Sequence, residues 1–266
     1  MERRTCSLRT ADLSVVQSGR ATLRRAMLGL ALTAASLPTH ASAQSSAARP
    51  FSVGEELTYR VKFGKIPVGT ARMHVAGVED IRGHATFHLI FTIDGGLPFF
   101  RVHDRYDSWI DTLTLASRRH VQEIREGGYK RNRRYEIFPE ERGFRENDDT
   151  TLKASVDSPL DEGSFIYFIR TVRVPVGQTR EFQQYFKPDR NPVVIRALRR
   201  DTVEVPSGRY PTVVVRPSIR ANGIFAEDGQ AELWISDDAK RMLIRMESKF
   251  AGFSLSLSLT DVKLGT

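Results

Sequence analysis

The end of the chain, residues 231–259, alternates between apolar and polar side chains. Met242, Ile244 and Met246 fall on one side of the chain, opposite a mostly charged set. From 253 to 259, phenylalanine and leucine alternate with serine. A period of two is typical of strands that have one buried and one solvated face. The pattern therefore predicts two tight antiparallel hairpins at this end.

The same alternation predicts three strands closer to the start of the chain, over 55–63, 70–78 and 84–93. Three consecutive strands of this kind favour an antiparallel meander with one solvated face. Residues 118–126 and 129–138 flank a Gly-Gly pair, which is a strong turn signal. They predict a further hairpin.

One stretch has helical spacing instead. Ser158 is a residue type that caps helices, Pro159 suits the first helical position, and two acidic residues follow. The apolar positions that recur with helical spacing are Phe165, Ile166, Phe168, Ile169 and Val172. We therefore expect one main helix, packed against the sheet, and four or more strands between 179 and 219.

Residues 1–43 have the pattern of a signal peptide. Arg24-Arg25 precede an apolar run from 26 to 37, and Ala41-Ser42-Ala43 matches a small-x-small cleavage signal. The run is shorter than the roughly 20 residues of a membrane span. We therefore expect cleavage near Ala43 and a periplasmic or secreted mature chain. The arginine pair leaves both the general secretion route and the twin-arginine route open.

The predicted mature chain begins with a disordered leader, residues 44–50, followed by a single β-rich domain over 51–266. It contains no second apolar run of transmembrane length. The one cysteine, Cys6, lies in the signal peptide, which excludes disulfides, thiolate zinc sites and cysteine nucleophiles from the mature chain. The signal peptide also carries six arginines and two acidic residues, so the net charge falls from +8 to +4. That balance is too mild to indicate nucleic-acid binding.

No catalytic motif stands out, so we expect a protein that is not an enzyme. Asp237-Asp238 is interpreted as a turn, because adjacent side chains in a turn point apart, and no serine lies in a Gly-x-Ser-x-Gly elbow. His74 and His88 would face each other if residues 79–83 closed a regular hairpin. A zinc or copper site would need a third ligand beside these two imidazoles, and none is apparent in the sequence. We therefore interpret both histidines as solvated side chains, and we expect neither a metal nor a cofactor.

Two segments allow either a structural or a functional interpretation. In residues 94–100, Leu97, Phe99 and Phe100 either cap the core or form a hydrophobic lip at the mouth of a cavity. The hairpin over 118–138 either protects a sheet edge from aggregation by its charge or docks an anionic lipid headgroup or polymer. Its basic residues are Arg118, Arg119, Arg125, Lys130, Arg131, Arg133 and Arg134.

Six short marks occur in order along the chain. They are Gly54-Glu55 with Leu57 and Tyr59, Val68-Gly69, Trp109-Ile110-Asp111, Ser164 with Tyr167 and Arg170, Val205-Pro206-Ser207-Gly208-x-Tyr210, and Trp234-Ile235-Ser236-Asp237-Asp238. In these marks the chain resembles, from about 51 to 264, a family of exported bacterial proteins, the domain of unknown function 3108. Leu243 departs from the family pattern, which has a proline shortly after the paired acids. The resemblance implies no assigned activity and no catalytic residues.

The closing Trp-Ile-Ser-Asp-Asp strand and turn is also similar to that of periplasmic lipoprotein carriers. This resemblance implies a mainly β fold with a strongly curved antiparallel sheet, an open half-barrel or incomplete β-barrel. One main helix is expected on its concave side. In such carriers the space between sheet and helix takes acyl chains.

These considerations favour a non-catalytic exported domain that binds a lipid or other apolar ligand in a half-barrel cavity. The residues expected to line that cavity are Leu57, Tyr59, Phe87, Leu89, Phe165, Phe168, Trp234 and Ile244. Such large side chains could equally fill a closed core, and the sequence leaves both arrangements open. The alternative function is an envelope structural or assembly factor that acts through protein–protein contacts.

Overall fold

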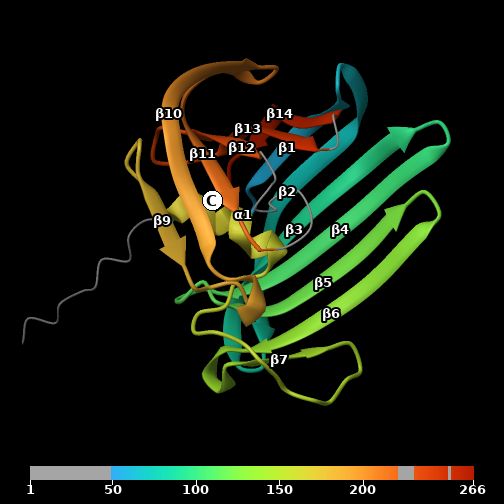
Figure 1. The fold of residues 1–266 in the computed structure, drawn as a ribbon, viewed down its shortest axis with the longest axis vertical. Helices are drawn as coiled ribbons and strands as arrows, with labels where there is room; N and C mark the ends of the chain where they lie inside the picture. Colours follow the sequence, from blue (N-terminus) through green and yellow to red (C-terminus); the bar gives the residue numbers. More distant parts are fainter. Residues whose placement is uncertain (1–48, 221–230, 251–252) are drawn as a thin grey trace, which may run out of the picture. The chain divides into compact units, whose positions relative to one another are not determined.

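The computed structural model describes residues 49–220, 231–250 and 253–266 of the chain (Figure 1). The predicted signal peptide, its cleavage site and residues 44–48 of the predicted leader lie outside the described residues. At the end of that leader, the carbonyl oxygen of Pro50 accepts a hydrogen bond from Arg170 Nη2 (2.7 Å). Among the described residues, no helix is both long enough and apolar enough to cross a membrane.

The described strands form one antiparallel sheet of fourteen strands. They are β1 (Glu56–Phe63), β2 (Ile66–Ile81), β3 (His84–Leu97), β4 (Phe100–Asp111), β5 (Ser117–Glu126), β6 (Tyr129–Phe138), β7 (Gly143–Glu146), β8 (Lys153–Ala154), β9 (Thr179–Phe182), β10 (Val193–Val205), β11 (Gly208–Ser218), β12 (Glu232–Ser236), β13 (Leu243–Phe250) and β14 (Phe253–Lys263). The spatial order is β8-β7-β6-β5-β4-β3-β2-β1-β14-β13-β12-β11-β10-β9. Two meanders therefore meet where β1 pairs with β14.

The sheet bends strongly around the helix α1 (Glu162–Thr171), which lies on its concave side (Figure 1). Two short 3₁₀ helices, η1 (Pro139–Glu141) and η2 (Pro188–Arg190), lie in connections. The outermost strands β8 and β9 do not pair with each other, so the sheet is not closed into a barrel. The predicted fold class is therefore confirmed: a mainly β, strongly curved and open antiparallel sheet with one main helix on its concave side.

The helix begins later than the sequence indicated. Asp161 is its N-cap, and Asp161 Oδ1 accepts hydrogen bonds from the backbone N–H groups of Gly163 (2.8 Å) and Ser164 (2.9 Å). Ser158 has a φ of 50° and stands outside the helix, so the predicted cap was wrong. The reason is tertiary, because Ser108 Oγ on β4 donates a hydrogen bond to Asp161 Oδ1 (2.6 Å). That contact fixes the point where the helix starts.

The other end of the helix is held by a fully buried ion pair. Arg170 donates to Glu55 Oε1 (2.6 Å) and Oε2 (2.9 Å), and its Nε donates to the carbonyl oxygen of Arg241 (3.0 Å). In return, Arg241 donates to the carbonyl oxygens of Arg170 (2.6 Å) and Val172 (2.8 Å). Glu55 and Arg170 belong to the family marks, and this contact gives them a structural role.

Two local predictions differ from the structure. The strand predicted over 84–93 is longer in the structure, because residues 94–97 extend β3 and Leu97 pairs with Phe100 at the start of β4. Glycine makes this possible, because a Cβ atom on Gly95 would lie 2.1 Å from the carbonyl oxygen of Val68 on the neighbouring strand.

The predicted facing pair of histidines is also wrong. His74 lies opposite Ile90 and His88 opposite Gly77, because residues 79–81 belong to the strand and Ile81 already pairs with His84. A register shift between Val75 and Gly77 offsets the two strands by one further residue. His88 instead contacts two carboxylates at 2.8 and 2.7 Å. Among the described residues, no three His, Cys, Asp or Glu side chains group together as they would to hold a metal ion.

Candidate functional site

A cavity of about 900 Å³ opens on the concave side of the sheet. It is lined by β1 to β6, by Ile219 and Leu255, by the start of α1, and by the segment 185–190. The helix has 10 residues and is about 15 Å long, whereas the 14 residues of β3 span roughly 45 Å. One short helix therefore covers only part of the sheet, and the uncovered part of the concave face lines the cavity.

One wall of the cavity is apolar. Its side chains come from alternate positions along the strands, as expected for one face of a sheet. They are Val61, Phe63, Val68, Phe91, Ile93, Leu97, Phe100, Val102, Ile124, Ile166, Ile219 and Leu255. Several of them, including Phe63, Phe91 and Ile93, are only half-buried. This wall is consequently apolar surface that water reaches.

A neighbouring part of the lining, the basic wall, carries four basic side chains, Arg131, Arg133, Lys187 and Arg190. Arg131 pairs across the strands with Ile124 of the apolar wall. Lys187 Nζ (3.1 Å) and Arg133 Nη1 (3.3 Å) both donate to the hydroxyl oxygen of Tyr135, so two positive charges converge there. Burial, followed by the nearby charge of Arg190, lowers the pKa of the Lys187 ammonium.

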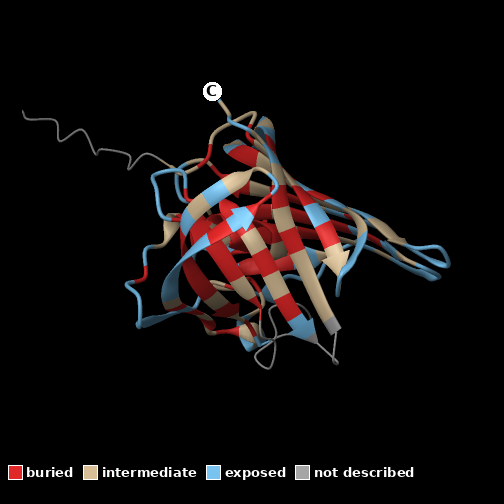
Figure 2. Ribbon diagram, turned by 90° about the horizontal axis from the view of Figure 1, so that it is seen from above, coloured by how far each residue is buried: buried red, intermediate tan, exposed pale blue. Residues whose placement is uncertain are grey.

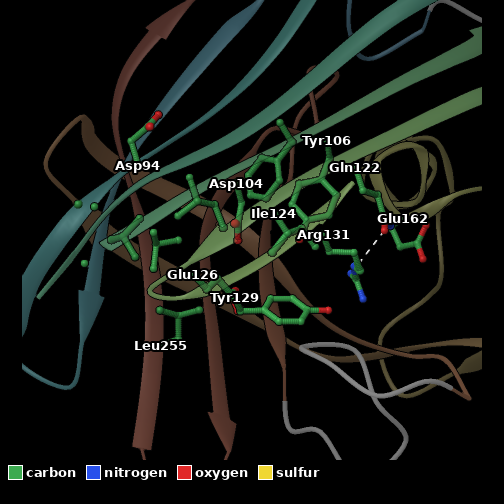
Figure 3. A pocket seen from close by; sticks show the side chains of 18 of the residues that line it. Asp94, Asp104, Tyr106, Gln122, Ile124, Glu126, Tyr129, Arg131, Glu162 and Leu255 are labelled. Atoms are coloured by element: carbon green, nitrogen blue, oxygen red, sulfur yellow. Dashed lines mark hydrogen bonds between the residues drawn. The ribbon is translucent and has the colours of Figure 1, made fainter. Parts of the chain in front are cut away.

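Most hydrogen-bond partners of these basic groups are neutral. Arg131 donates to the side-chain oxygen of Gln122 (3.4 Å), shown by the dashed line in Figure 3, and Arg190 donates to the hydroxyl of Tyr185 (3.4 Å). Arg133 differs, because its Nε lies 3.4 Å from Glu146 Oε1. Lys187 and Arg190 thus bond to tyrosine hydroxyls, whereas the charge of Arg131 also acts on the nearby carboxyl groups of Asp104 and Glu126.

An ion pair between the buried His120 and the half-buried Glu162 lies beside the cavity at the start of α1. His120 Nε2 lies 3.1 Å from Glu162 Oε2, and the hydroxyl of Tyr185 donates to Glu162 Oε1. Burial alone would lower the pKa of the His120 imidazole, but the charges of Asp161 and Glu162 raise it to about 9. Burial would likewise raise the pKa of the Glu162 carboxyl, but His120 lowers it to about 2. Both groups are therefore charged at neutral pH and largely cancel each other.

Ser108, His120 and Asp161 lie within hydrogen-bonding reach of one another, as in a nucleophile–base–acid arrangement. All three are fully buried. The hydroxyl of Ser108 donates to Asp161 Oδ1 (2.6 Å), and His120 Nδ1 lies 2.9 Å from the carbonyl oxygen of Asp107. A Cβ atom on Gly163 would lie 2.4 Å from Ser108 Oγ, so glycine lets the helix start press against β4. The cluster anchors the start of the helix against β4.

Two carboxyl groups share the cavity nearer its mouth. Asp104 and Glu126 face the cavity from β4 and β5, together with the ring of Tyr129 (Figure 3). Burial raises the pKa of each carboxyl, and for Glu126 the neighbouring Asp104 raises it further. Proximity to each other thus disfavours the doubly ionised pair, which reduces the negative charge inside the cavity.

None of the eight side chains predicted to line a cavity is among those that line this one. Seven of them are buried in the hydrophobic core: Leu57, Tyr59, Phe87, Leu89, Phe165, Trp234 and Ile244. Phe168 packs edge-on against Phe182 with ring centroids 5.0 Å apart. Trp234 donates to Asp201 (2.9 Å). Trp234 pairs with Arg245 and therefore lies on the other face of the sheet. On β1 and β3 the inward face was predicted correctly, but the cavity begins one inward position further on, at Val61 and Phe91.

The structure separates the interpretations left open for two segments. Phe99 is 101% exposed at the turn between β3 and β4, and Leu97 and Phe100 are exposed at the rim and also line the cavity. This placement supports the hydrophobic lip rather than the core cap.

In the basic hairpin β5–β6, Arg118 is buried and bonded to Asp111 and Glu140, whereas Arg131 and Arg133 point into the cavity. Strand β6 is covered by β7 over Tyr135–Phe138, so the edge interpretation is wrong for that half. The basic cavity residues were missed because charged positions in a strand were assumed to face water. The sequence did contain a signal for their inward position. Arg131 and Arg133 stand at every second residue between Tyr129 and Tyr135, so all four side chains belong to one face of the strand.

Comparisons with solved structures support the fold. A β-barrel-like protein of the domain of unknown function DUF1849, from Brucella abortus, is similar with a TM-score of 0.50 and 7% identity, over 81% of this chain and 99% of that chain. A protein provisionally described as a lipoprotein, from Parabacteroides distasonis, gives a TM-score of 0.37 at 9% identity over 80% and 98% of the two chains. One provisionally described as an exported protein with a YmcC-like fold, from Bacteroides fragilis, gives 0.30 at 10% over 80% and 97%. At such identities the first likeness shows the fold alone.

The family assignment rests on the sequence. No curated protein gives a significant match to this chain. The profile of the family described as "Protein of unknown function (DUF3108)" matches residues 58–258, which is well over half of the chain. That span includes five of the six marks and the whole of β2 to β13. The chain therefore belongs to the DUF3108 family.

Proposed function

We propose that this chain is an exported, non-catalytic domain that binds an amphiphile, with the apolar part of the ligand in the cavity and its anionic group against the basic wall. The observation that supports the proposal is the cavity of about 900 Å³ with one apolar and one basic wall. Its volume lies within the range of about 300–1,000 Å³ typical of small-molecule sites. The leader pattern at residues 1–43 supports export.

The apolar wall favours a ligand with a hydrocarbon part. Phe63, Phe91 and Ile93 are half-buried in the protein alone, and an acyl chain would remove their remaining surface from water. Burial of apolar surface is worth about 25 cal/mol per Å². A purely polar ligand would leave that surface wet and would gain nothing from it.

The basic wall favours an anionic group on the same ligand. Lys187 and Arg190 donate to tyrosine hydroxyls rather than to carboxylates, so their charges are available to a ligand. Hydrogen bonds between such cations and a carboxylate or phosphate are about twice as strong as bonds between neutral groups. A neutral lipid would lose this contribution.

A displacement titration tests the proposal. A fluorescent fatty acid is bound to the purified protein and is then displaced with oleate. Ile93→Trp places a large side chain in the cavity, and we expect it to abolish binding without loss of the folded state. The matched control is Leu113→Trp, because Leu113 is 86% exposed outside the cavity. The control should bind oleate like the parent protein.

Equal binding by the Ile93→Trp variant and the parent protein would contradict the proposal, because the fatty acid would then occupy another place. Near-ultraviolet circular dichroism of both variants checks that the tertiary structure is kept. A protein that binds no fatty acid at all in the parent form would contradict the proposal equally.

A further inference from the structure

Several large apolar side chains are exposed at one end of the sheet, beside the cavity mouth. The turns β1–β2, β3–β4 and β5–β6 all lie at this end, because Gly69 pairs with Gly95 and the N–H of Gly127 donates to the carbonyl oxygen of Arg101 (2.7 Å). The exposed apolar side chains here are Ile66, Leu97, Phe99, Phe100 and Tyr129. Figure 2 shows two of these hairpin ends as exposed projections from the more buried body of the sheet.

The ends of β3–β4 and β5–β6 are packed on each other. A Cβ atom on Gly127 would lie 2.8 Å from the ring of Phe100, so this ring rests directly on the neighbouring turn. Phe99 is 101% exposed, and it is not among the residues that line the cavity. The two turns therefore present one continuous apolar tip, with Phe99 at its outermost point.

Basic side chains surround the apolar tip. Lys65, Arg101, Arg125 and Lys130 are all exposed in or beside these three turns. The nearby carboxylate of Asp94 is paired with His103 (2.8 Å). Apolar side chains ringed by lysine and arginine match the interface of a bilayer that contains anionic lipids, where acyl chains lie below negatively charged headgroups.

The tip is continuous with the cavity. Leu97, Phe100 and Tyr129 are exposed at the rim and also line the cavity wall. A molecule that entered the cavity from a bilayer in contact with this end would meet apolar side chains throughout. Contact with a bilayer thus fits the position of the mouth as well as the charge of the tip.

We propose that this end of the sheet docks on an anionic phospholipid bilayer, with Phe99 inserted into the interface and the surrounding lysines and arginines on the headgroups. The inference goes beyond the proposed function, since a domain could bind an amphiphile from solution without touching a membrane.

Vesicle sedimentation with the purified mature chain, residues 44–266, tests the docking. Vesicles of phosphatidylcholine alone are compared with vesicles that also contain phosphatidylglycerol. The parent protein should pellet with the anionic vesicles, and Phe99→Ser should lower its partition coefficient about ten-fold or more, because a phenyl ring leaves the interface. Leu113→Ser is the matched control, since Leu113 follows the opposite end of β4, and it should leave partitioning unchanged.

Three further measurements keep the outcome unambiguous. The fluorescence of Phe99→Trp should shift to the blue with anionic vesicles, and Lys130→Glu should weaken binding more than Lys240→Glu, a lysine in the β12–β13 turn. Oleate binding should be unchanged in Phe99→Ser. The docking proposal is overturned if the parent protein ignores anionic vesicles, if Phe99→Ser pellets like the parent, or if Phe99→Ser also loses oleate binding. The proposed function is tested separately, by oleate binding to the cavity variant Ile93→Trp.

Discussion

His120 is a fully buried histidine that carries a charge. Asp161 and Glu162 raise its pKa to about 9, above the ordinary value of 6.5. A folded-state pKa above the unfolded value means that the histidine stabilises the fold fully below about pH 6.5, and that this contribution is lost as the pH rises through 9. Glu162 behaves in the opposite sense, because its pKa is lowered to about 2, and its contribution is lost as the pH falls from 4.5 towards 2.

His120→Gln should remove the alkaline part of this dependence. We expect the free energy of unfolding of the parent protein, from urea titrations, to decrease between pH 6.5 and pH 9. In the variant the decrease over the same interval should be smaller, from a lower starting value. A part should remain, because burial lowers the pKa of His88 but Asp107 and Glu79 raise it above the ordinary value. His103→Gln, at an exposed position, should retain the parent slope. A parent protein whose stability is unchanged over this interval would show that the His120 charge is not retained on folding.

Lys187 is expected to recognise the anionic group of the ligand. Lys187→Met should reduce affinity for oleate about ten-fold or more, since a hydrogen bond to a charged group contributes about 1.5–3 kcal/mol. Affinity for the neutral monoolein should change little. Lys263→Met, an exposed lysine at the end of β14, is the control. Isothermal titration calorimetry measures both ligands, and equal losses for oleate and monoolein would contradict the role of the charge.

At the scale of elements, α1 is held by polar contacts at both ends. Asp161 and Ser108 hold its start, and the buried pair Arg170–Glu55 holds its end. Glu55→Ala would leave the Arg170 guanidinium buried without its carboxylate, which typically costs about 3–5 kcal/mol. Urea unfolding measures this loss. The double variant Glu55→Leu with Arg170→Met should recover part of it, and a single-variant loss below about 1 kcal/mol would show that the pair does not anchor the helix.

The sequence predicted most elements because alternation and helical spacing are local signals. Residues 129–138 were predicted as a strand and form β6 with those bounds. The helix cap was misplaced because the choice between Ser158 and Asp161 depends on Ser108, which lies 53 residues from Asp161 in sequence. The inward position of Arg131 was missed because alternation shows that a strand has two faces, but not that one charged face borders a cavity.

At the scale of the whole molecule, the length of the sheet relative to the helix creates the site. Leu89 lies in the core under the helix, whereas Ile93, two inward positions further along β3, borders the cavity. A sequence pattern gives both residues the same environment, because each is an inward apolar position on one strand. Only the three-dimensional extent of α1 distinguishes them, which explains why the predicted lining residues lie outside the cavity.

This contrast gives a paired prediction for stability. Leu89→Trp should lower the free energy of unfolding by about 1–3 kcal/mol, because extra volume is forced into a filled core. Ile93→Trp should cost less than about 1 kcal/mol, because the indole ring extends into open space. Urea unfolding of the two variants, compared with the parent protein, measures the difference. Equal costs would mean that the cavity and the core are packed alike.

The central claim is that the cavity holds an amphiphile, and native mass spectrometry tests it most directly. The protein is purified without detergent from an envelope fraction, sprayed intact, and extracted with organic solvent. We expect a discrete extra mass that extracts as an anionic lipid or fatty acid and that is absent from Ile93→Trp. A bare polypeptide mass, unchanged after incubation with oleate and phospholipid, would contradict the account and would favour a role through protein–protein contacts.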